Sequence, residues 1–154
     1  MGATEEALIN KIAYWERSIV GISNSYDAFK NPTNITTGLA PLVLHYPPSF
    51  RSEPKAHFNK WINELQIRST LLVKPRSNMG ANLNFLENEA MPFLQKWRLK
   101  FQDATVVNDM LGIAPTLTRA FISSGDYGVG GNLLTIGGVE WIGAIFTFTF
   151  TEIT

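Results

Sequence analysis

The residues best suited to chemistry in this sequence are its two histidines, His45 and His57. A histidine can bind a metal ion or exchange a proton near neutral pH. Neither histidine has a carboxylate at a spacing typical of metal ligands, and the chain has no cysteine to complete a zinc site. We therefore predict no metal and no cofactor, and we interpret each histidine as a surface or half-buried side chain.

A second candidate is the glycine-rich stretch Gly128-Val129-Gly130-Gly131. A dinucleotide-binding loop would need another glycine where the chain has Leu133, and it would open a helix, whereas we expect a strand there. No Lys-Ser or Lys-Thr pair follows the glycines, so the stretch is not a P-loop. We predict that it belongs to a flexible loop, Ser124 to Asn132.

Acid–base and nucleophilic catalysis also lack a recognisable arrangement. Glu87 and Glu89 are two residues apart, so they would point to different sides of a helix. No serine lies in a Gly-x-Ser-x-Gly motif. A small enzyme or ligand-binding domain remains an alternative, but it would need a concave pocket with converging polar groups, which the sequence does not indicate. We predict that the protein is not an enzyme.

The segment Lys96 to Phe101 alternates basic residues with Trp97, Leu99 and Phe101. Aromatic rings placed between cations can bind single-stranded nucleic acid. At helical spacing the same pattern places Trp97 and Phe101 inward and the cations outward, which is the interpretation that we favour. The charges of the whole chain balance at zero and are dispersed, which argues against sequence-specific nucleic-acid binding.

The length and composition of the chain describe one globular domain, residues 1–154. A chain of this length can bury a sizeable core without disulfides. No apolar run approaches the about 20 residues of a membrane helix, and the first residues do not resemble a signal peptide. We expect a domain that has no membrane partner.

The strongest structural signal is the last stretch, Val139 to Ile153. Three phenylalanines alternate there with three threonines, at Phe146, Phe148, Phe150 and at Thr147, Thr149, Thr151. This period of two predicts a strand whose Phe face is covered by helices. Burial of each Phe would contribute about 1.5–3 kcal/mol. Gly137-Gly138 precedes the stretch and predicts a tight turn, so the chain should end in a β-hairpin.

Two main helices are predicted. The first runs from Thr4, a good N-cap, to Val20, with an apolar stripe at Leu8, Ile12, Trp15 and Ile19. The second runs from Leu83 to Phe101, and Pro92 either kinks it or begins the second of two helices. Val106 to Leu111 adds a weak helix or a turn.

The remaining strands are predicted at Pro41–Tyr46, Trp61–Lys74 and Leu117–Ser123, with long connections at Ile22–Ala40 and Ser49–Lys60. Pro47-Pro48 is expected to end the first of these strands. In the second, Leu65, Ile67, Ser69, Leu71 and Val73 share one face. The element order predicts an α+β fold, in which a mostly antiparallel sheet carries two main helices on one face and closes with a C-terminal β-hairpin.

Four segments together suggest a known family. They are the N-terminal helix followed by Leu42 to Pro48, the long strand Glu64 to Val73, the run Met91-Pro92-Phe93-Leu94 with Leu111-Gly112 after it, and the closing hairpin from Ser124 to Thr147. The most specific pattern is the Gly-Val-x-aromatic-apolar-Gly sequence at Gly138–Gly143. In this layout the chain resembles the tail terminator family of long-tailed bacteriophages, also called tail completion or tail-to-head joining proteins.

The resemblance implies a non-enzymatic virion protein at the tail–neck junction, made in the host cytoplasm. Such proteins form a hexameric ring that caps the tail tube, stops its polymerisation and gives the head connector a docking surface. The implied partners are other copies of the chain, the tail tube protein and the connector or stopper, with DNA passing through the lumen. The alternative is another neck or tail structural protein: a head-completion stopper, an adaptor or a tube subunit.

We expect the contacts of such a ring to come from the loops between the elements, because loops carry function on a rigid scaffold. The polar candidates are Arg51, Lys55, Lys74, Arg76, Asp126 and Tyr127. Exposed ion pairs are common on protein surfaces and weak, so for each of these side chains we favour plain solvated surface over a specific contact.

Overall fold

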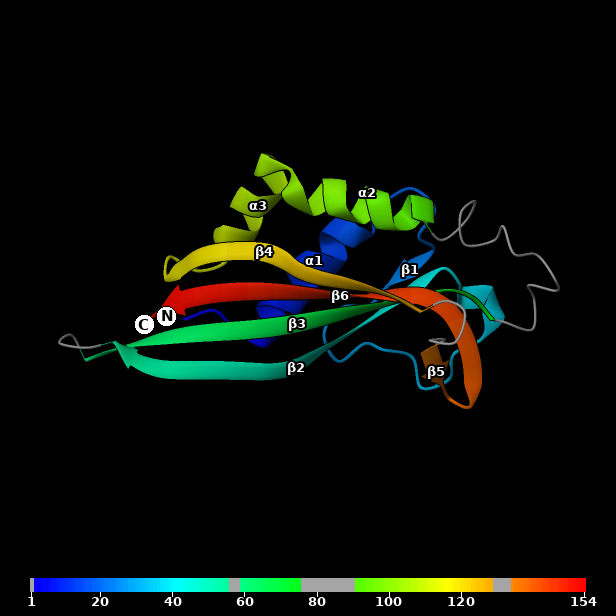
Figure 1. Ribbon diagram of the computed structural model, residues 1–154, viewed down its shortest axis with the longest axis horizontal. Coiled ribbons are helices and arrows are strands. Elements are labelled where there is room, and N and C mark those ends of the chain that lie inside the picture. The colour runs from blue at the N-terminus through cyan, green and yellow to red at the C-terminus, as the bar shows by residue number, and fades with distance from the viewer. Residues whose placement is uncertain (1, 56–58, 76–90, 129–133) are drawn as a thin grey trace.

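A computed structural model describes residues 2–55, 59–75, 91–128 and 134–154. In chain order the elements are α1 (Glu5–Glu16), β1 (Asn24–Ser25), the 3-10 turn η1 (Thr37–Leu39), β2 (Leu42–Lys55), β3 (Lys60–Pro75), α2 (Met91–Gln102), α3 (Ala104–Leu111), β4 (Leu117–Gly128), β5 (Leu134–Ile136) and β6 (Val139–Ile153). The described strands form one sheet, and the α-helices lie together on one side of it (Figure 1).

The sheet has the strand order β1-β2-β3-β6-β4, and the short β5 also pairs with β6. Among the described strand pairs, β1 and β2 are parallel and the others are antiparallel. The predicted α+β class with a mostly antiparallel sheet is therefore confirmed. Two main helices were predicted, and the described residues form a third α-helix, α3, in the segment predicted as a weak helix or a turn. Asp103 stabilises its start by accepting the backbone N–H groups of Thr105 and Val106.

The core lies between the helices and the Phe face of β6. Phe146, Phe148 and Phe150 are all buried there, as their alternation predicted. The Trp97 ring of α2 stacks on Phe146 with centroids 4.6 Å apart, and Phe101 meets Phe148 edge-on at 4.8 Å. The inward placement of Trp97 and Phe101 confirms the helical interpretation of the Lys96–Phe101 segment.

The first helix is shorter than its sequence suggests. Thr4 caps α1 as expected, since its hydroxyl accepts the backbone N–H of Ala7 at 3.2 Å. The helix ends at Glu16 rather than Val20. The hydroxyl of Ser18 donates to the carbonyl of Trp15 at 2.5 Å, and such side-chain bonds compete with helix continuation.

Two strand predictions from local periodicity are confirmed. The predicted strand Trp61–Lys74 is β3, and its apolar face is buried throughout, at Leu65, Ile67, Ser69, Leu71 and Val73. The closing hairpin is formed by β5 and β6. Gly137 and Gly138 connect them with φ angles of 60° and 79°, the left-handed conformation that favours glycine in a tight turn.

Two predicted loops are wrong, because both segments continue as strands. Pro47 and Pro48 do not end β2, which runs on to Lys55 and fills most of the expected loop from Ser49. This part of β2 is at the sheet edge, where a missing N–H costs no ladder bond, and the register shifts between Tyr46 and Ser49 to accommodate the prolines. The predicted loop from Ser124 is also strand as far as Gly128; the rest of it lies outside the described residues.

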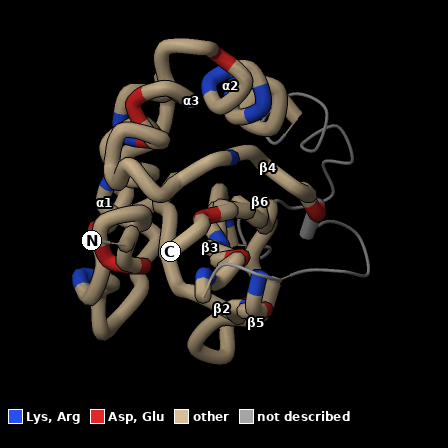
Figure 2. The backbone as a smooth tube through the Cα atoms, turned by 90° about the vertical axis from the view of Figure 1, so that its left-hand side faces the viewer, with Lys and Arg blue, Asp and Glu red and all other residues tan. Residues whose placement is uncertain are grey.

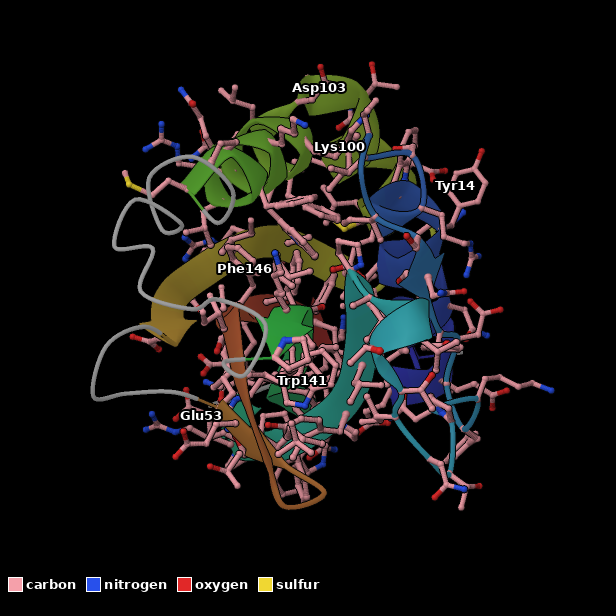
Figure 3. All side chains as sticks on the ribbon, turned by 90° about the vertical axis from the view of Figure 1, so that its right-hand side faces the viewer. Tyr14, Glu53, Lys100, Asp103, Trp141 and Phe146 are labelled. Carbon is pink, nitrogen blue, oxygen red and sulfur yellow. The ribbon has the colours of Figure 1, made fainter. Side chains whose placement is uncertain are left out.

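Short elements cover one end of the sheet face that is opposite the helices. Leu42, Leu44, Leu72 and Trp141 form a small apolar cluster there, packed under residues of η1 and β5. Figure 3 shows Phe146 toward the helices and Trp141 on the side away from them. Among the described helices, none has the length and apolar character needed to span a bilayer.

Candidate functional site

The hairpin of β2 and β3 extends to one end of the molecule (Figure 1). On its helix-side face, Phe50 pairs with Leu65 and Pro54 pairs with Trp61. Leu65 is buried, but Phe50 is 70% exposed and Trp61 is 51% exposed. We call Phe50, Pro54 and Trp61 the aromatic strip. It is an apolar surface in which the core face of the sheet continues into solvent.

The base of the aromatic strip is held by polar contacts. Ser52 donates to Asn63 at 2.7 Å, and Asn63 in turn donates to Glu152 at 3.4 Å. Glu152 is buried and also accepts the backbone N–H of Ala3 at 2.9 Å. The chain just before α1 therefore lies against the end of β6, the strand next to the hairpin. It brings the two acidic residues of the first turn of α1, Glu5 and Glu6, to the same end of the molecule.

A groove of about 750 Å³ lies between α2 and β4, and we call it the α2–β4 groove. It is lined by Met91, Pro92, Leu94, Gln95, Arg98, Ile122, Gly125 and Phe146. Most of this lining is apolar, and Gln95 and Arg98 supply its polar side chains. The charged residues of α2 are all cations, since Lys96 and Lys100 accompany Arg98. No sequence pattern indicated this groove, because it is formed by elements that are distant in the chain.

Both sides of the sheet end in strands with an unpaired outer edge. Beyond Tyr46, no described strand pairs with the outer side of β2, and none pairs with the outer side of β4. The edge of β2 carries three prolines, Pro47, Pro48 and Pro54, whereas β4 has none. Proline on an edge strand opposes pairing with other chains, so the β4 edge is the less protected of the two.

The sheet face opposite the helices is polar along β6. Thr147 and Thr149 lie on it beneath longer neighbours. The guanidinium of Arg68 lies 5.8 Å from the ring centre of Tyr46, and that of Arg119 lies 4.9 Å from Phe121. Figure 2 shows Lys and Arg interspersed with Asp and Glu along the backbone.

The residues predicted as polar interface contacts do not form one site. Arg51 and Lys55 lie on the β2–β3 hairpin, Arg51 opposite Glu64. Asp126 and Tyr127 lie on β4 at the other side of the sheet, and Lys74 lies near the far end of β3, opposite Ile142. Arg76 lies outside the described residues. The structure thus brings Arg51 and Lys55 together and separates them from Lys74, Asp126 and Tyr127.

The sequence-based interpretation of His45 is wrong, because the side chain is fully buried. Its Nε2 contacts the carboxylate of Glu16, whose side chain is also fully buried, and its Nδ1 lies 2.6 Å from the carbonyl oxygen of Tyr26. The hydroxyl of Ser25 donates to the same Glu16 oxygen at 3.3 Å. His57 lies outside the described residues.

The Glu16–His45 pair uses both ring nitrogens of His45, because Nδ1 faces the Tyr26 carbonyl oxygen while Nε2 faces the Glu16 carboxylate. The pair joins α1 to β2 and to the segment after β1, and neither side chain reaches solvent. Its role is therefore to hold elements together. Because Glu16 and His45 are 29 residues apart in the chain, no spacing pattern in the sequence could indicate the pair.

Within the described part of the chain, no group of three or more His, Cys, Asp or Glu side chains is arranged to hold a metal ion. No protein-family model matches the sequence, and no curated protein matches it either.

Proposed function

We propose that this protein is a tail terminator of a long-tailed bacteriophage: a structural subunit that forms a ring on the end of the tail tube, stops tube polymerisation and presents a docking surface to the head connector. The observation that carries the proposal is the sheet of the described strands, in which β4 and the part of β2 beyond Tyr46 have no described strand on their outer sides, joined to an exposed aromatic strip at one end. Such a surface is suited to assembly with other protein chains.

The arrangement of the edges favours a ring over a symmetric dimer. An unpaired strand edge is a template for pairing with another chain. The outer edges of β2 and β4 are different surfaces on opposite sides of one sheet. When unlike surfaces of identical copies meet, the contact is head-to-tail, and it closes into a ring if the rotation between neighbours closes. The number of six subunits comes from the family resemblance.

The layout of the chain supports the terminator assignment over a general assembly role. The N-terminal helix α1, the long strand β3, the helix α2 with its Pro92 and the closing β5–β6 hairpin occur in the order on which the resemblance rests. A head-completion stopper, an adaptor or a tube subunit shares parts of this layout and is the second candidate. The difference is functional, because a tube subunit polymerises into long tubes whereas a terminator stops at one ring.

The test is to mix the purified protein with tubes assembled from the tube protein of the same virus. We expect light scattering to show a closed ring of six at high concentration or on addition of tubes, and negative-stain images to show density on tube ends only. Tube growth from fresh tube protein should stop after capping. Long tubes made by this protein alone would identify a tube subunit. Failure to bind tube ends at any concentration would refute the terminator proposal.

A further inference from the structure

We infer that neighbouring copies of this chain make contact by inserting the aromatic strip of one copy into the α2–β4 groove of the next. The inference rests on the proposed ring and names the two surfaces that would form it. The occupant of the groove is a second copy of the same chain.

The two surfaces lie toward opposite ends of the molecule. In Figure 1 the β2–β3 hairpin reaches one end of the long axis, while the first residues of α2, which line the groove, lie toward the other end. One copy therefore cannot fill its own groove with its own strip. A copy that offers both a donor and an acceptor surface is suited to a head-to-tail contact.

The strip and the groove match in chemistry and size. A volume of about 750 Å³ is within the range of binding sites that enclose an apolar group. Aromatic side chains that enter such pockets dominate the affinity of many protein interfaces. Among the large apolar side chains described on the hairpin, Phe50 is the most exposed. Trp61 lies further toward the hairpin tip on the same face, so both rings can approach one apolar surface.

The charges beside the two surfaces are complementary. The first turn of α1, with Glu5 and Glu6, lies at the end that carries the strip. On the hairpin itself, Arg51 and Lys60 alternate onto the opposite face, so they do not neutralise these acids on the strip side. Beside the groove, α2 contributes cations and no acid, and Arg98 is exposed at the groove wall.

The β4 edge gives the incoming hairpin a backbone partner. Ile122 and Gly125 of β4 line the groove, so a hairpin that enters it would lie along the unpaired side of β4. Gly125 keeps this wall open, because a Cβ there would lie 3.3 Å from the Phe146 ring. Strand addition at an edge, with alternate side chains in a pocket, is an established mode of recognition.

Cross-linking tests the contact directly, because the natural chain has no cysteine. Ser52 lies between Phe50 and Pro54 on the strip face, and Gln95 lines the groove. We expect a mixture of Ser52→Cys and Gln95→Cys chains to give a covalent heterodimer with a short bismaleimide. The matched control, Ser52→Cys with Thr135→Cys on β5, should not. Rings that form without the first cross-link would overturn this contact and leave the ring proposal standing.

Charge reversal and strip removal supply an independent readout by sedimentation. Arg98→Glu should weaken self-association about twofold to fivefold, as expected for a surface ion pair, and the combination with Glu6→Lys should restore it. Phe50→Ser should weaken self-association at least about tenfold without loss of folding, because the side chain is mostly exposed. Unchanged association of both Arg98→Glu and Phe50→Ser would overturn the contact. A wild-type chain that neither associates nor binds tube ends would overturn the ring itself.

Discussion

The substitution His45→Leu tests whether the buried Glu16–His45 pair holds the N-terminal half of the fold together. It removes the partner of a fully buried carboxylate. Glu16 would keep the Ser25 hydroxyl at 3.3 Å, while its second oxygen already has no hydrogen-bond partner among the described residues. Breaking a buried pair by removal of one member costs about 3–5 kcal/mol, since a buried charge is left uncompensated. We expect a loss of unfolding free energy in this range.

Urea denaturation followed by tryptophan fluorescence measures this loss. With a denaturant slope of about 1–3 kcal/mol per M, the midpoint should fall by about 1 M or more. The matched control is Asp27→Asn, which removes the exposed 3.0 Å ion pair with Arg17, near Glu16 in the chain. That change should cost less than about 1 kcal/mol.

The double variant Glu16→Leu with His45→Leu separates pairing from packing. Replacement of both members of a buried pair by apolar residues is often close to neutral, so the double variant should be more stable than the single variant His45→Leu. The pair does not stabilise the fold as we infer if His45→Leu costs no more than Asp27→Asn. The same holds if the stability losses of the single variants Glu16→Leu and His45→Leu simply add in the double variant.

Three further predictions concern the sheet and its helices. Phe148→Ala should cost about 3–5 kcal/mol of unfolding free energy in thermal or urea denaturation, because the ring is fully buried. Phe121→Ala on the opposite face should cost far less, and equal losses would contradict the assignment of the two faces. Gly143→Ala should cost more than about 3 kcal/mol, since a Cβ there would overlap the Leu71 carbonyl oxygen, and a near-wild-type melting temperature would disprove this packing. Asp103→Ala should lower stability by about 0.5–2 kcal/mol through loss of the α3 cap, whereas Asp103→Asn, which keeps an acceptor oxygen, should lose less.

The elements that the sequence predicted correctly are those whose signal is local. The alternation of Phe146 to Thr151 and the glycine pair Gly137-Gly138 are complete within a few residues, and both gave the right element. The proline pair Pro47-Pro48 led to a wrong prediction, because its effect on a strand is not local. Whether proline ends a strand depends on which side of that strand has a neighbour, and this is decided by the rest of the sheet.

The candidate site could not be predicted in the same way, because its parts come from distant segments. The α2–β4 groove combines residues from Met91 to Phe146, and the Glu16–His45 pair joins α1 to β2. The exposure of Phe50 could not be predicted either, because Phe50 lies in a segment that was expected to be a loop. Nothing in the sequence indicated that the residue continues the buried face of the sheet into solvent. Of the described polar residues predicted to make contacts, Arg51 and Lys55 lie on β2 beside the aromatic strip.

The placement of prolines along β2 bears on which contacts between copies can form. Without N–H groups at Pro47, Pro48 and Pro54, two β2 edges cannot build a long ladder with each other, which opposes a symmetric dimer. Between Pro48 and Pro54 a short window remains, Ser49 to Glu53, in which every residue keeps its N–H group. Phe50 lies inside this window. The same stretch thus combines a short run of free edge with an exposed anchor, which favours a short contact with the proline-free edge of β4 on a neighbouring copy over open-ended sheet growth.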